Sequence, residues 1–266
     1  MEYWGVGRDE KRPGDRKEPA GRGAARSAAE WVREELGFDP DEGQTLVLST
    51  GSKRGLLNCT RQWGKSTITA AKAVHQAWTE AGSLTLVVSP GARQSGEFVR
   101  KAAAFARRLG VSPKGDGDNA ISIEFPNKAR IVGLPGNEAT TRGFSAVSLL
   151  LVDEAARVDD NLYKALRPML AVSGGSLWLM STPDGKRGFF WEAWEHGGEE
   201  WERIQVTATE CPRITQEFLE EEMRNLGEQW YRQEYLCEFL DSVSGVFDRD
   251  LVERAMSEEF EPLVID

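Results

Sequence analysis

The chain has 266 residues, of which 40% are hydrophobic and 29% are charged, and its formal net charge is −10. That length accommodates one α/β domain with a small appendage. Three cysteines without paired spacing argue against a disulfide framework, and two histidines disfavour a zinc site. No apolar run reaches the roughly twenty residues that cross a bilayer, and no signal-peptide core is evident at the N-terminus. We therefore expect a cytosolic protein that is neither secreted nor membrane-bound.

The first segment, residues 1–23, is rich in glycine, proline and charged residues and has few apolar positions. This composition predicts a disordered leader. A helix is expected over residues 24–36, ending at Gly37, and we place the start of the folded core at residue 24.

Residues 59–67, CTRQWGKST, match a Walker A phosphate-binding loop in part. The usual pattern G-x-x-x-x-G-K-[ST] is filled from Gly64 onward, whereas Cys59 stands in place of the first glycine. The residues of this loop expected to bind nucleotide are Thr60, Gln62, Gly64, Lys65, Ser66 and Thr67.

The surroundings of the loop suit this chemistry. An apolar strand is predicted over 54–58 and a helix over 66–81, so backbone N–H groups at a helix N-terminus would face a phosphate. Lys65 would reach the β- and γ-phosphates of ATP, and the Ser66 hydroxyl would help to hold Mg²⁺. Such a short motif also arises by chance.

Next come a strand over 84–89, a helix over 92–109 and a hairpin formed by 120–125 and 129–133. Basic side chains on the helix and in two loops are candidates for DNA contact, although each is more commonly a solvated surface charge. These candidates are Lys53, Arg54, Arg93, Arg100, Lys101, Arg107, Arg108, Lys186 and Arg187.

Residues 147–155, VSLLLVDEA, form an apolar run that ends in two carboxylates, as in a Walker B strand. Asp153 would hold Mg²⁺ through water, and Glu154 would polarise the attacking water. The alternative is a strand that merely ends in solvated acids.

A further strand, 176–183, ends in Ser181 and Thr182. Their hydroxyls would sense the γ-phosphate or the attacking water, although Ser-Thr-Pro alone is only a turn signal. The repeated strand and helix order predicts a RecA-like P-loop fold of the ASCE type, in which helices flank a mostly parallel sheet with right-handed crossovers.

After Gly185 the chain becomes aromatic and then acidic. Aromatic residues between 189 and 201 are expected to pack against the sheet edge. Residues 215–239 predict two helices that break near Gly227, with Thr215 as a helix cap. Residues 192–266 carry 21 acidic and 6 basic side chains, so this part would avoid DNA.

Taken together, the motifs resemble the ATPase domain of the large terminase subunits of tailed bacteriophages, from about Phe38 to Asp248. The matching segments are FDPDEGQ (38–44), TRQWGKST (60–67), TTRGFSAVSLLLVDEAARV (140–158), YKALRPML (163–170), LWLMSTPDGKRGFFWEAW (177–194), CPRIT (211–215) and YRQEYLCEF (231–239).

The resemblance implies three further site residues. Arg61, within the loop, would lie beside the nucleotide; otherwise it is a loop arginine satisfied by a nearby carboxylate. Gln44 matches a glutamine that contacts adenine, and the alternative is a solvated side chain. Arg142 matches a catalytic arginine finger that a neighbouring subunit would supply to the γ-phosphate, the alternative being an exposed loop arginine.

The resemblance also implies the organisation of the chain: a RecA-like core over 24–200, a small helical lid or linker subdomain over 201–248, and a tail over 249–266. Large terminases usually continue into a nuclease domain that holds two metal ions. We expect none in this chain, and therefore no nuclease activity.

The function that follows is ATP hydrolysis coupled to translocation of double-stranded DNA into a procapsid. The implied cofactors are ATP and Mg²⁺, and the implied partners are DNA, the portal protein, the small terminase subunit and further copies of the chain in a ring, all in the host cytoplasm and transiently at the portal. A DNA helicase or translocase of another P-loop class and a non-catalytic nucleotide-dependent scaffold remain alternatives.

Overall fold

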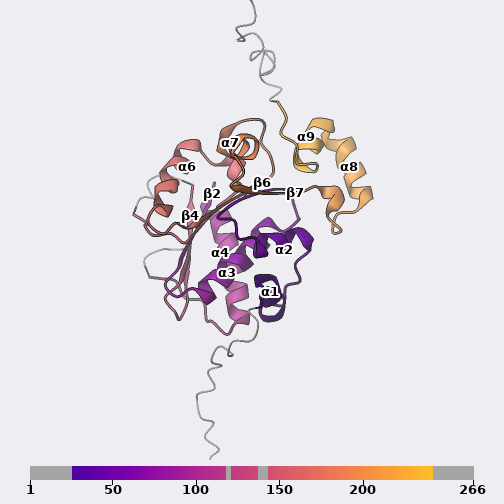
Figure 1. Ribbon diagram of the computed structural model, residues 1–266. Coiled ribbons are helices and arrows are strands. Elements are labelled where there is room, and N and C mark those ends of the chain that lie inside the picture. The colour runs from indigo at the N-terminus through magenta and orange to yellow at the C-terminus, as the bar shows by residue number, and fades with distance from the viewer. Residues whose placement is uncertain (1–25, 118–120, 137–142, 242–266) are drawn as a thin grey trace, which may run out of the picture.

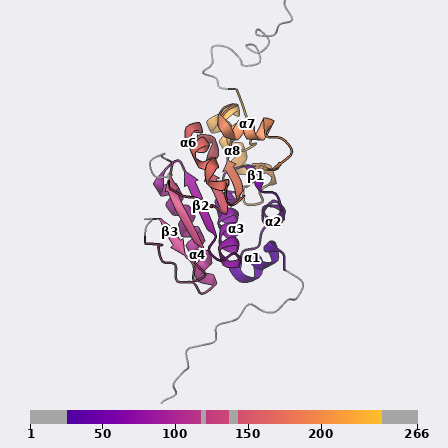
Figure 2. The same ribbon diagram turned by 60° about the vertical axis from the view of Figure 1, so that its left-hand side comes forward.

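The computed structural model describes residues 26–117, 121–136 and 143–241, and these contain a seven-stranded sheet flanked by helices (Figure 1). The strand order is β3-β4-β2-β5-β6-β1-β7, in which β3 pairs antiparallel with β4 and every other pairing is parallel. The strands are β1 (Arg54–Cys59), β2 (Leu84–Ser89), β3 (Ser122–Glu124), β4 (Arg130–Pro135), β5 (Leu149–Asp153), β6 (Ser176–Ser181) and β7 (Trp201–Val206). β3 lies at one edge of the sheet (Figure 2).

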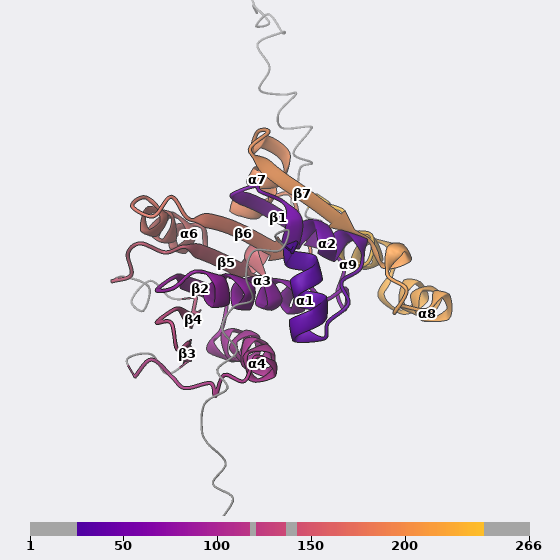
Figure 3. The same cartoon turned by 60° about the horizontal axis from the view of Figure 1, so that its bottom comes forward.

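Helices cover both faces of this sheet, which confirms the expected RecA-like architecture. One face carries α1 (Ala28–Leu36), α2 (Glu42–Ser49), α3 (Lys65–Thr79) and α4 (Ala92–Arg108), and the other carries α6 (Asp160–Leu166) and α7 (Gly188–His196) (Figure 1). Two further helices, α8 (Gln216–Leu226) and α9 (Glu228–Glu234), stand beside the β7 edge (Figure 3).

The central strands are apolar throughout because both of their faces are buried. Along β5, Leu151 faces the core formed with α1 to α4, while Leu150 and Val152 face the core formed with α6 and α7. Side chains of a strand alternate between the two faces of a sheet, so a strand covered on both sides needs an uninterrupted apolar run. This is the pattern seen in the sequence.

The structure contains two elements that the sequence did not predict. The segment around Gln44 is a helix, α2, whose N-terminus is closed by a capping box between Asp41 and Gln44. The interval after residue 200 begins with β7, which pairs with β1 along its whole length. The strand therefore lies with the sheet, although 201–248 was expected to form the lid. The sequence of β7 lacks a continuous apolar run, because an edge strand needs only one buried side, and it was therefore not recognised as a strand.

The first helix begins at Ala28, where Ser27 and Glu30 form a capping box, and it ends at Gly37 in the left-handed region as expected. The predicted leader over 1–23 lies outside the described residues. Within the described part of the chain, none of the helices has the length and apolar character needed to cross a membrane.

The helices α8 and α9 form a small unit with a core of its own. Leu219 and Tyr231 are buried there together with Ala208. Thr215 caps α8 by accepting a hydrogen bond from the backbone of Phe218, and Gly227 separates the two helices with φ 80°. The expected pair of helices broken at Gly227 is therefore present.

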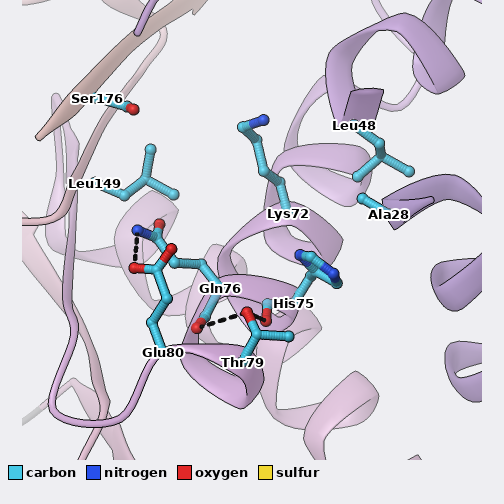
Figure 4. Close-up of a pocket in the computed structure, with 9 residues that line it drawn as sticks. All are labelled: Ala28, Leu48, Lys72, His75, Gln76, Thr79, Glu80, Leu149 and Ser176. Atoms are coloured by element: carbon cyan, nitrogen blue, oxygen red, sulfur yellow. Dashed lines mark hydrogen bonds between the residues drawn. The ribbon is translucent and has the colours of Figure 1, made fainter. Parts of the chain in front are cut away.

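A hollow of about 190 Å³ opens between α1 to α3 and the N-terminal ends of β5 and β6 (Figure 4). Lys72 lines it and donates a hydrogen bond of 2.9 Å to the carbonyl oxygen of Val47. The ammonium also lies 4.7 Å from the centroid of the Trp178 ring. Burial lowers the pKa of Lys72 to about 8 and also lowers the pKa of His75 beside it.

The Trp178 ring lies over Gly55, its partner in the β1–β6 register. A methyl group at Gly55 would approach this fully buried ring to 2.3 Å. We expect Gly55→Ala to lower the free energy of unfolding by about 1–3 kcal/mol through overpacking. The matched control is Gly51→Ala, whose added methyl group meets nothing within 4 Å. Urea unfolding would measure both, and equal stabilities would contradict the packing described here.

Lys72 predicts a pH-dependent stability. Below pH 8 the amine is protonated in both the folded and the unfolded state, so folding bears the full cost of burying the charge. Between about 8 and the ordinary pKa of 10.5, the unfolded state binds more protons and the stability rises with pH.

We therefore expect Lys72→Met to be more stable than the wild type at pH 7 by about 1–3 kcal/mol, less the lost hydrogen bond, with the gap closing towards pH 10.5. Urea unfolding across this range measures it. The exposed control, Lys101→Met, should change the stability by less than about 0.5 kcal/mol. A stability difference between Lys72→Met and the wild type that did not depend on pH would contradict the lowered pKa of Lys72.

Candidate nucleotide site at the ends of β1, β5 and β6

The loop between β1 and α3 adopts a conformation that suits the close approach of a ligand to its backbone. Gln62 has φ 65° and Gly64 has φ 104°, both in the left-handed region. Glycine adopts this region without strain, whereas Gln62 does so at some cost. The backbone N–H groups of Thr67 and Ile68 bond to the Gly64 carbonyl and begin α3 there. The loop therefore ends at a helix N-terminus, as expected.

The loop is held in place through Trp63. Its side chain is buried in the core, and its carbonyl oxygen accepts hydrogen bonds from Gln44 Nε2, at 3.0 Å, and from the Arg213 guanidinium. Gln44 is itself buried, and its Oε1 accepts from the Asp41 backbone. The alternative of a solvated glutamine is therefore excluded. Contact with adenine stays a prediction.

Lys65 is buried and points back at its own loop. Its Nζ donates to the carbonyl oxygens of Cys59, at 2.5 Å, and Thr60, at 3.0 Å. The same ammonium opposes the effect of burial on Cys59, although burial dominates and raises the pKa of that thiol. Cys59, Cys211 and Cys237 are all buried free thiols, so the described residues contain no disulfide.

Asp153 and Ser66 meet across the gap between β5 and α3. The Ser66 hydroxyl donates to Asp153 Oδ2 at 3.2 Å, and the Glu154 backbone donates to Asp153 Oδ1 at 3.1 Å. Burial raises the pKa of Asp153, and the charge of Glu154 acts in the same direction. A cation at this point would offset both effects.

These oxygen donors suit Mg²⁺, which commonly binds one or two carboxylates together with phosphate and water. The donor set of Ser66 and Asp153 therefore fits the magnesium site expected from the sequence. Across the part of the chain that the structure describes, no group of three or more His, Cys, Asp or Glu residues could hold a metal by itself. A site of this kind would be completed by the substrate.

Glu154 leads from β5 into a single 3₁₀ turn, Ala155–Arg157, and adopts the left-handed conformation with φ 52° and ψ 43°. Such a conformation in a residue other than glycine costs on the order of 1–3 kcal/mol and is concentrated at active sites. The Glu154 carboxylate is partly exposed and accepts a hydrogen bond from Arg157 at 3.1 Å. Its side chain is thus open to solvent on one side and held by Arg157 on the other.

The two hydroxyls at the end of β6 are buried between the other strand ends. Thr182 accepts a hydrogen bond from Arg157 at 3.2 Å. The Ser181 hydroxyl is fully buried and makes no hydrogen bond among the described residues. A buried hydroxyl in this situation costs free energy unless a ligand or water satisfies it.

Four charged residues form a network that the sequence only partly predicts. Arg61 pairs with Glu234 at 2.8 Å, as in the alternative of a loop arginine satisfied by a carboxylate. Arg157 pairs with the same Glu234 at 2.8 Å and with Glu154. Neither Arg157 nor Glu234 had been singled out, although each lies in a segment that carries the family resemblance.

The expected arginine finger, Arg142, lies outside the described residues. Of the basic candidates for DNA contact, Arg100 pairs with Glu97, and Arg108 donates to the carbonyl oxygen of Leu36. Lys53 and Arg54 donate to carbonyl oxygens of the turn before β6. These bonds give the side chains structural partners, and their contact with DNA stays a prediction.

Comparisons with known proteins agree with this arrangement. A family model described as "Terminase large subunit, T4likevirus-type, N-terminal" matches residues 56–254. The terminase large subunit of Thermus virus P23-45 is 24% identical over 247 residues, which cover 80% of this chain and 51% of that protein. The chain thus spans about half the length of this curated relative.

Solved structures share the fold. The large terminase ATPase domain of Thermus phage P74-26 superposes with a TM-score of 0.69 at 20% identity, covering 81% of this chain and all of that one. The large terminase of a thermophilic bacteriophage in complex with ADP gives a TM-score of 0.65 at 15% identity, covering 79% and 57% of the two chains. Since the family model matches most of the sequence, this chain belongs to the terminase large subunit family, through its N-terminal, T4likevirus-type domain.

Proposed function

We propose that this chain binds ATP with Mg²⁺ and hydrolyses it to drive double-stranded DNA into a viral procapsid. The observation that carries the proposal is the contact between Asp153 and Ser66, with Glu154 as the next residue along the chain. A buried carboxylate, a helix-start hydroxyl and a second carboxylate suit phosphoryl transfer to water. The membership of the family supports the biological context.

Ser66 and Asp153 would hold Mg²⁺, which, when bound, neutralises charge on the β- and γ-phosphates. Lys65 would exchange its two loop carbonyls for phosphate oxygens, because an ammonium forms stronger hydrogen bonds with anions than with neutral carbonyls. The backbone N–H groups of residues 60–67 would surround the β-phosphate. The large terminase of the thermophilic bacteriophage has been solved in complexes with ADP and with ATP-gamma-S, which supports a nucleotide ligand for this fold.

Glu154 would accept a proton from the attacking water and orient it. Ser181 and Thr182 lie between the two motif-bearing strands and would sense loss of the γ-phosphate. Arg142 would stabilise the charge of the transition state from a neighbouring subunit of a ring. The proposed partners are double-stranded DNA, the portal protein and the small terminase subunit, and the place of action is the host cytoplasm and the procapsid portal.

We expect Glu154→Gln to lower kcat for ATP hydrolysis by at least about 100-fold, because the amide cannot accept the proton. The affinity for ATP should stay within about threefold, since the amide preserves the size of the side chain and the role given to Glu154 concerns the water rather than the nucleotide. A phosphate-release assay and titration with a fluorescent ATP analogue measure the two quantities. Glu221→Gln, on the exposed surface of α8, is the matched control. Undiminished hydrolysis would exclude the role given to Glu154, and binding without hydrolysis by the wild type would favour a nucleotide-dependent scaffold.

Arg142 supplied in trans predicts that the hydrolysis rate per subunit rises with protein concentration. Arg142→Ala and Glu154→Gln should each be inactive alone. Mixing them should restore part of the activity, because one subunit then offers an intact Glu154 and its neighbour an intact Arg142. A rate per subunit that is independent of concentration, with no recovery on mixing, would show that no arginine is supplied between subunits.

A further inference from the structure

Glu234, the last residue of α9, is a buried carboxylate held by two arginines. Its side chain is 2% exposed, Oε2 accepts from Arg61 Nε at 2.8 Å, and Oε1 accepts from Arg157 at 2.8 Å. A buried carboxylate is tolerated only when its oxygens are paired. The two partners come from different elements, because Arg61 belongs to the Walker A loop and Arg157 to the turn that follows β5.

The main chain at the end of α9 is tied to the same place. The Thr60 hydroxyl donates to the carbonyl oxygen of Glu234 at 3.1 Å, and the Asn58 amide donates to that of Cys237 at 2.8 Å. Both donors are fully buried. The end of α9 therefore lies against the C-terminal end of β1 and the start of the phosphate-binding loop, so a displacement of α9 would have to break these bonds.

Arg157 links Glu234 to the proposed catalytic carboxylate. Its guanidinium contacts Glu234 at 2.8 Å, Glu154 at 3.1 Å and the Thr182 hydroxyl. A guanidinium prefers to pair with one carboxylate through two parallel hydrogen bonds. Here the Arg157 guanidinium is shared between two carboxylates, and its shorter contact is with Glu234. Glu154 consequently keeps part of its hydrogen-bonding capacity for another partner.

We propose that Glu234 is a positioning residue, which restrains Arg157 so that Glu154 is available to water. Without the Glu234 charge, Arg157 closes on Glu154 and occupies the oxygens that would accept the proton. Because Glu234 moves with α9, the position of the α8–α9 unit sets the activity of Glu154. The inference rests on the proposed function, and it identifies Glu234 as a residue that controls the catalytic carboxylate of that function.

The test uses Glu234→Gln, which preserves size but removes the charge. We expect kcat for ATP hydrolysis to fall by about tenfold or more, with KM within about threefold, because both oxygens of Glu234 are paired with arginines and leave none to contact the nucleotide. Removing the freed arginine as well, in Glu234→Gln with Arg157→Gln, should recover part of the lost kcat. The control is Glu238→Gln, which breaks the pair of Glu238 with Arg232 in the same segment and should leave kcat unchanged.

Wild-type kcat in Glu234→Gln, a change confined to KM, or a double variant no more active than Glu234→Gln would overturn the inference. Wild-type protein that failed to hydrolyse ATP would instead remove the proposed function.

Hydrogen exchange gives a second measurement that needs no folded Glu234 variant. In the wild type, adding ATP-gamma-S with Mg²⁺ should change amide exchange in residues 228–238, and in the variant that combines Arg61→Gln with Arg157→Gln this response should be lost. The coupling between Glu234 and the nucleotide site would be contradicted if exchange in residues 228–238 of the wild type did not change with the nucleotide. It would also be contradicted if exchange changed equally in both proteins.

Discussion

The register of three neighbouring parallel strands is the constraint on which the candidate site depends. Leu57 of β1 pairs with Met180 of β6, which pairs with Asp153 of β5. The chain leaves all three strands within two residues of this level, so the phosphate-binding loop, the hydroxyl pair and the acidic pair emerge side by side. Ligands of open α/β sheets bind at the carboxyl ends of the strands. A slip of one residue in β5 would turn Asp153 to the other face and separate it from Ser66.

The site concentrates polar groups that the rest of the core avoids. Lys65, Asp153 and Glu234 are buried, and so is the unpartnered hydroxyl of Ser181. Burying such groups opposes folding unless each one has partners. Loop carbonyls, a serine and two arginines supply them for the three charged groups, and the apolar faces on either side of β5 and β6 provide the stability that permits the arrangement. The free-energy cost of burying these polar groups indicates that they serve a function rather than the stability of the fold.

This polar network is one of the links between the α8–α9 unit and the core. Its own apolar core is small, and Phe218, Leu226 and Trp230 remain partly exposed. By contrast, Asn58, Thr60, Arg61 and Arg157 all bond to residues 234–237. Removing one partner of a buried ion pair is costly, so these contacts would rearrange only if another charge replaced the one that was lost. A unit attached in this way can respond to what occupies the phosphate-binding loop.

The sequence by itself determined the strands with continuous apolar runs, the Walker A and Walker B motifs and the helix pair around Gly227, because periodicity and turn chemistry are local properties. It did not reveal α2 or β7, whose residues become informative only in the folded chain: Gln44 is buried and donates to the carbonyl oxygen of Trp63, and β7 is defined by its pairing with β1. Nor could spacing show that Glu234 lies between Arg61 and Arg157, since 173 residues separate Glu234 from Arg61 and 77 from Arg157. Local sequence determines which groups carry the chemistry. Only the tertiary structure decided which of them touch, because contacts between distant segments depend on strand order and on the packing of α9 against the end of β1.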